Sequence, residues 1–86
     1  MTAMTEHEVR ELFENVEETL LSDDSGSNAR KMIGFFNLCA ARIKSVAATA
    51  PLDERKEATA VLSALDAARD IIEQVWANVH AGKRLP

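Results

Sequence analysis

Apolar residues recur at alternating steps of three and four along most of the chain, which predicts α-helices rather than strands. A first helix is expected over about residues 5–21, where Thr5 and Glu8 match the Ser/Thr-x-x-Glu capping box. A second helix is expected over about 28–49 and a third over about 52–81. The pattern therefore predicts an all-α protein.

The two longer helices are expected to fold back on each other as an antiparallel hairpin. Pro51 separates them, because proline disfavours helix at the residue before it and suits the first turn of a new helix. Each helix carries an apolar seam, and the two seams are predicted to face each other. The predicted hairpin core consists of Met32, Phe36, Cys39, Ile43 and Val46 on the second helix and Val61, Leu65, Ala68, Ile72, Val75 and Val79 on the third.

A single small domain is expected over residues 1–86. The run SDDSGS predicts a polar loop at 22–27 without an apolar anchor, and Gly82 opens a short tail at 82–86. A chain of this length buries only about 60% of its unfolded surface on folding. We therefore expect a second copy or another protein to contribute to its stability.

Several apolar residues lie off the two seams. They are Phe35, Leu38, Leu62, Ile71 and Trp76. Two interpretations are open: the first helix or a second copy covers these residues, or part of their surface is a groove for a protein partner. Tryptophan and phenylalanine are frequent anchors of such interfaces. The pattern predicts packing in both cases and a specific partner only in the second.

Composition and charge exclude several functions. The formal charge is −4, with fourteen acidic against ten basic residues, which opposes binding to nucleic acid or to an anionic membrane. The acidic N-terminal segment lacks the basic and apolar blocks of a secretion signal, and no window is apolar over the roughly 18 residues of a membrane span. The one cysteine, Cys39, has no partner for an internal disulfide. We expect a soluble intracellular protein without membrane insertion.

Residues for catalysis or metal binding do not form a recognisable set. The segment HEVRE, beginning at His7, lacks the second histidine of a zinc-binding helix, and His80 stands alone near a helix end. Gly34 is isolated, so no glycine-rich phosphate loop is present. We expect no enzymatic activity, no cofactor and no metal.

The third helix is similar to the C-terminal helix of the small type III secretion co-chaperones YscE, SsaE and EscE. The segment is PLDERKEATAVLSALDAARDIIEQVWANVHAG, and its matching positions are Leu62, Ala64, Leu65, Ala68, Ile71, Ile72 and Trp76. The preceding VEETLLSDDSGSNARKMIGFFNLCAARIKSVAA has a similar layout, so the resemblance covers roughly residues 12–81. It is one of pattern and length, because this family has no diagnostic motif.

The resemblance implies a helical hairpin in the bacterial cytoplasm that binds a tetratricopeptide-like, helical-repeat co-chaperone. Together the two would hold a needle subunit monomeric before export. The matched residues Leu62, Leu65, Ile72 and Trp76 are implied for the hairpin core or the partner interface. This chain departs from the family in its longer acidic first helix and in the pair Phe35-Phe36.

A protein of another class fits the same pattern. In a homodimeric four- or six-helix bundle, acting as a regulator or antitoxin-like module, an identical chain would cover the residues off the seams. The oligomeric state of the purified chain distinguishes these two interpretations.

Overall fold

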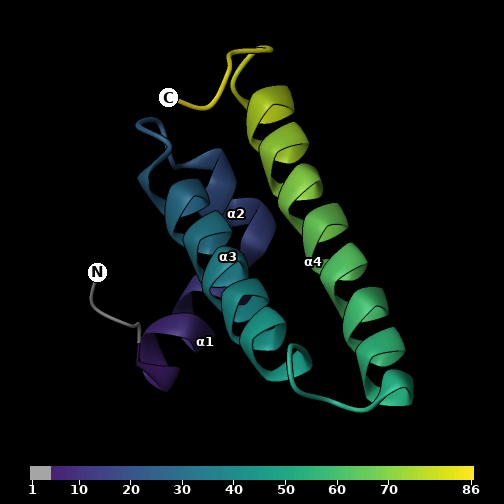
Figure 1. Cartoon of the computed structure of the whole chain (residues 1–86). Helices are drawn as coiled ribbons and strands as arrows, with labels where there is room; N and C mark the ends of the chain where they lie inside the picture. Colours follow the sequence, from purple (N-terminus) through teal and green to yellow (C-terminus); the bar gives the residue numbers. More distant parts are fainter. Residues whose placement is uncertain (1–4) are drawn as a thin grey trace.

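The computed structural model describes residues 5–86 and consists of a long helical hairpin with two short helices packed on it (Figure 1). The helices are α1 (Glu6–Glu14), α2 (Val16–Leu21), α3 (Ser27–Ala47) and α4 (Leu52–Val79). Residues 5–86 contain no strand. The all-α hairpin predicted from the apolar periodicity is confirmed. The single-domain prediction also includes residues 1–4, which lie outside the described residues.

The first predicted helix is divided into α1 and α2. Thr5 is the N-cap of α1, and its hydroxyl accepts a hydrogen bond from the Glu8 backbone N–H at 3.2 Å. The interruption falls at Asn15, whose φ of −142° and ψ of 67° are not helical. The Asn15 side chain donates to the Glu18 carboxylate at 3.0 Å. Asparagine is a weak helix former because its side chain competes for local hydrogen bonds, which favours a break here.

The ends of α4 follow the signals in the sequence. Pro51 precedes its first turn, and the backbone N–H of Arg55 donates to the Pro51 carbonyl at 3.0 Å. At the other end the backbone turns left-handed at Ala81 and Gly82. The N–H of Gly82 closes this end by donating to the Ala77 carbonyl at 2.7 Å.

The core lies toward one end of the hairpin. Its buried apolar residues are Leu12, Leu20, Ala29, Met32, Ile72 and Trp76. They come from α1, α2, the N-terminal half of α3 and the C-terminal half of α4. The helices α1 and α2 both pack against α3, and α2 also contacts α4. The half of the hairpin next to Pro51 therefore contributes no fully buried side chain.

The predicted hairpin core is only partly found inside the protein. Met32 and Ile72 are buried. The half-buried members are Phe36, Cys39, Ile43, Leu65, Ala68 and Val75. Val46, Val61 and Val79 are instead exposed, Val46 by 71%. Val46 and Val61 lie in the half of the hairpin next to Pro51, which contains no fully buried side chain, and Val79 is the last residue of α4. These valines are exposed because they lie at the ends of the hairpin, away from the core.

Candidate protein-binding surface

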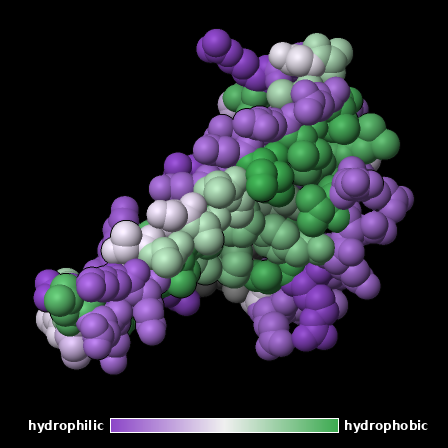
Figure 2. All heavy atoms as spheres, turned by 90° about the vertical axis from the view of Figure 1, so that its right-hand side faces the viewer, coloured by the Kyte–Doolittle hydropathy of each residue, from purple (hydrophilic) through white to green (hydrophobic). Residues whose placement is uncertain are grey.

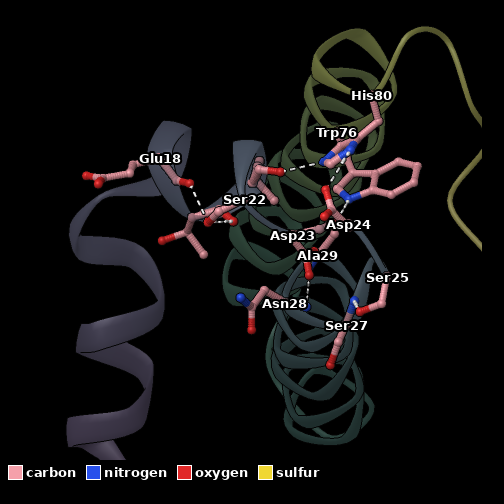
Figure 3. A network of polar contacts seen from close by, with 12 residues as sticks. Glu18, Ser22, Asp23, Asp24, Ser25, Ser27, Asn28, Ala29, Trp76 and His80 are labelled. Carbon is pink, nitrogen blue, oxygen red and sulfur yellow. Dashed lines mark hydrogen bonds and ion pairs between the residues drawn. The ribbon is translucent and has the colours of Figure 1, made fainter.

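A buried carboxylate organises the start of α3. Asp23 is only 5% exposed, and its two oxygens accept hydrogen bonds from the backbone N–H groups of Asn28 and Ala29 at 3.1 and 2.9 Å (Figure 3). These groups have no partner within the helix, and the N-terminal end of the helix dipole favours a negative charge. Asp23 thereby fixes the loop after α2 to the first turn of α3.

The same loop is bonded to the C-terminal end of α4. The indole Nε1–H of Trp76 donates to the Asp23 carbonyl oxygen at 2.8 Å, and His80 donates from Nε2 to the Leu20 carbonyl oxygen at 2.8 Å (Figure 3). The Trp76 and His80 rings stack with their centroids 4.4 Å apart. The predicted polar loop at 22–27 is thus held to α4 by the hydrogen bond from Trp76 to Asp23, in place of an apolar anchor.

The C-terminal tail closes this end of the molecule. Leu85 is half-buried and packs against the core, and Arg30 donates from Nη1 to the Ser25 and Pro86 carbonyl oxygens at 3.1 and 3.4 Å. Gly26 has a φ of 77°, and a Cβ added there would lie 2.7 Å from Leu85 Cδ1. The left-handed conformation favours glycine at this position, and any larger residue would displace the Leu85 side chain.

We expect Asp23→Ala to lower the free energy of unfolding by about 1–2 kcal/mol, because two backbone N–H groups lose their acceptor. Chemical denaturation followed by circular dichroism measures this loss. The matched control is Asp24→Ala, at an exposed neighbouring carboxylate, which should change stability by less than about 0.5 kcal/mol. Equal effects of the two substitutions would contradict the capping by Asp23.

Apolar residues remain exposed along α4. They include Ala60, Val61, Ala64, Ala67 and Ile71, which we call the α4 face. Figure 2 shows the side of the molecule that carries α4, where a hydrophobic area runs along the middle between hydrophilic margins. Ile71 is 58% exposed, whereas the adjacent Ile72 is 6% exposed and belongs to the core. One side of α4 therefore builds the hairpin, and another presents apolar surface to solvent.

The residues predicted at a partner interface have different environments. Ile71 is exposed, whereas Leu38 and Leu62 are half-buried. Phe35 is half-buried against α1, with its ring centroid 5.9 Å from that of Phe13. Trp76 is 2% exposed and satisfied by its hydrogen bond within the chain, so it is a core residue and not a surface anchor. The first helical segment thus covers Phe35, while the surface at Ile71 stays open.

The described residues present little other chemistry. Residues 5–86 hold no group of three His, Cys, Asp or Glu side chains placed to bind a metal ion. A shallow depression between α3 and α4 contains Arg69, which bonds to Asn37 at 3.2 Å and to Asp66 at 3.3 Å. Three of its polar side chains are thus engaged with one another. None of the helices described here is both long and apolar enough to span a membrane.

A family model described as Type III secretion system regulatory protein HrpD6 matches residues 1–78. The chain belongs to the HrpD6 family. No curated protein and no solved structure matches it. Membership of the HrpD6 family agrees with the link to type III secretion implied by the resemblance of α4. The family match does not support the more specific resemblance to YscE, SsaE and EscE.

Proposed function

We propose that this HrpD6-family protein is a co-chaperone of type III secretion in the bacterial cytoplasm. It binds a tetratricopeptide-like chaperone, and the pair keeps a needle subunit from assembling before export. The uncovered α4 face is the observation that supports this proposal most strongly. Exposed apolar patches of this kind on small proteins commonly mark protein-binding sites.

The α4 face lies on a helix that is held in place by core packing and hydrogen bonds. Ile72 and Trp76, on the buried side of α4, pack in the core. Trp76 also bonds to the loop after α2, and His80 bonds to the Leu20 carbonyl oxygen of α2. A helix held in this way offers a preformed surface, so little conformational entropy is lost when another protein binds. Binding at Ile71 would leave the contacts of Ile72 intact.

This surface has the properties that the proposed function requires. A needle subunit that assembles through an amphipathic helix stays monomeric when the chaperone pair covers the apolar side of that helix. Such binding requires apolar surface and no catalysis. The α4 face supplies such surface through alanine, valine and isoleucine side chains. Three of the fourteen acidic residues, Asp53, Glu57 and Asp70, are exposed on the same helix.

The proposal is tested by producing this chain together with the helical-repeat chaperone and the needle subunit of the same secretion system. We expect the three to co-elute and the needle subunit to stay unassembled, as measured by light scattering. Ile71→Glu should restore assembly, because it places a charge in an apolar contact. The control Thr59→Glu adds the same charge to an exposed site on the hydrophilic side of α4.

Assembly of the needle subunit at the same rate with and without this chain would contradict the proposal. The second candidate is then a homodimeric regulator, which the description of the HrpD6 family as regulatory proteins favours.

A further inference from the structure

The outward side of α4 carries a row of residues with an approximately symmetric order. Polar residues lie at both ends of the row and small or apolar residues lie between them. The row is Asp53, Glu57, Ala60, Ala64, Ala67, Ile71, Gln74 and Asn78, and we call it the α4 seam. Its steps alternate between four and three, as in the contact line of two paired helices. Every member is exposed. The seam therefore has the spacing of a helix–helix contact but no helix within residues 5–86 to cover it.

The seam faces away from the rest of the molecule. At 100° of rotation per residue, Trp76 lies about 160° around the helix from Ala60. Trp76 packs in the core with residues of α1, α2 and α3 and bonds to the loop after α2, so these elements lie on the other side of α4 from Ala60. From Asp53 to Asn78 the seam is about 38 Å long, at 1.5 Å per residue. A second helix can approach it along this length.

We infer that the seam pairs with the seam of a second copy of this chain, in antiparallel orientation. A two-fold axis midway between Ala64 and Ala67 places Ala64 of one copy opposite Ala67 of the other. The same axis pairs Ala60 with Ile71. Two copies then meet through the same surface on each, which is the usual arrangement in symmetric dimers.

Side-chain size favours this register. Alanine at the centre of the seam allows the two helix axes to approach to about 8 Å, the lower end of the usual range. Ile71 of one copy lies next to Ala60 of the other, so a large side chain meets a small one on both sides of the axis.

Charge selects the antiparallel orientation. In this register Glu57 faces Gln74 of the other copy, and Asp53 faces Asn78, so each carboxylate meets a carboxamide that can donate a hydrogen bond to it. A parallel pair would bring Glu57 against Glu57 and Asp53 against Asp53. Like charges directly opposite each other destabilise a helix pair, so the parallel arrangement is disfavoured.

The seam is one helix wide, which fits a dimer that exchanges rather than a permanent one. The pairing would shelter the α4 face in the free chain and release it when another protein binds. This self-association is measured on the purified chain, without the chaperone or the needle subunit. A monomeric chain would therefore overturn the pairing and leave the proposed co-chaperone function standing.

Sedimentation equilibrium of the purified full chain gives the first test. The average mass should rise from one chain toward two with increasing concentration. Ala64→Glu should hold it at one chain, because two new carboxylates meet at the axis, whereas Thr59→Glu should behave as the unsubstituted chain. Glutamate is close to alanine in helix propensity, so Ala64→Glu should keep its helical circular dichroism. A mass of one chain at every concentration would overturn the inference.

Disulfide formation tests the register, with Cys39→Ser in every sample. A mixture of Ala60→Cys and Ile71→Cys chains should form a covalent dimer on mild oxidation, because the two sites face each other within disulfide reach. Ala60→Cys alone should not, since its two sites lie about 16 Å apart along the pair. Covalent dimers of Ala60→Cys alone, or none in the mixture, would overturn the antiparallel register.

Discussion

Replacing Trp76 with alanine is expected to lower the free energy of unfolding by about 3–5 kcal/mol, the largest loss at any single position. Trp76 is the largest fully buried side chain among the described residues, and its removal also leaves the Asp23 carbonyl oxygen without its indole donor. A domain of this size has a total stability at the lower end of about 5–15 kcal/mol. Urea unfolding followed by far-ultraviolet circular dichroism measures the effect.

The control for Trp76→Ala is Trp76→Phe, which keeps much of the buried aromatic surface and removes the indole N–H. We expect a loss of about 1–3 kcal/mol, the usual effect of leaving a buried polar group without its partner. A loss below about 1 kcal/mol for Trp76→Ala would contradict the placement of Trp76 at the centre of the core.

The two neighbouring isoleucines of α4 should behave in opposite ways. Ile72→Ala is expected to lower the free energy of unfolding by about 2–5 kcal/mol, because it leaves a cavity in the core. Ile71→Ala should change it by about 0.5 kcal/mol or less in a dilute, monomeric sample, since its side chain is exposed. The same denaturation experiment measures both, and the pair controls for helix propensity because the two substitutions are chemically identical.

The two substitutions should affect partner binding in the opposite order to stability. Ile71→Ala should weaken the interaction with the helical-repeat chaperone and needle subunit, whereas folded Ile72→Ala should bind almost normally. Equal large losses of stability at Ile71 and Ile72 would mean that α4 has no spare apolar side, and both the proposed function and the α4 seam would lose their basis.

The hairpin itself could be predicted because its signals are local. Proline at position 51 and glycine at 82 lie at the boundaries of α4, and the three-four alternation gives both long helices within a few residues. The break at Asn15 was missed, since one weak helix former within an apolar periodicity does not by itself predict an interruption.

The arrangement of the core was harder to predict from the sequence, because it depends on which helix covers which face. Periodicity shows that α4 has a wide apolar side, but not that the fold buries Ile72 and leaves Ile71 exposed. Trp76 was a candidate for either the hairpin core or a partner interface, and the structure buries it with its indole bonded to the Asp23 carbonyl. Asp23 itself lies four residues before α3, within a run of interchangeable polar residues, so its capping of that helix had no distinctive signal.

The central claim is that the open side of α4 binds protein, and a calorimetric titration tests it most directly. The chaperone and needle subunit would be titrated with the unsubstituted chain, with Ile71→Glu and with Thr59→Glu. The account predicts at least about tenfold weaker binding for Ile71→Glu, which corresponds to about 1.4 kcal/mol, and unchanged binding for Thr59→Glu. Equal affinity of all three chains would contradict it.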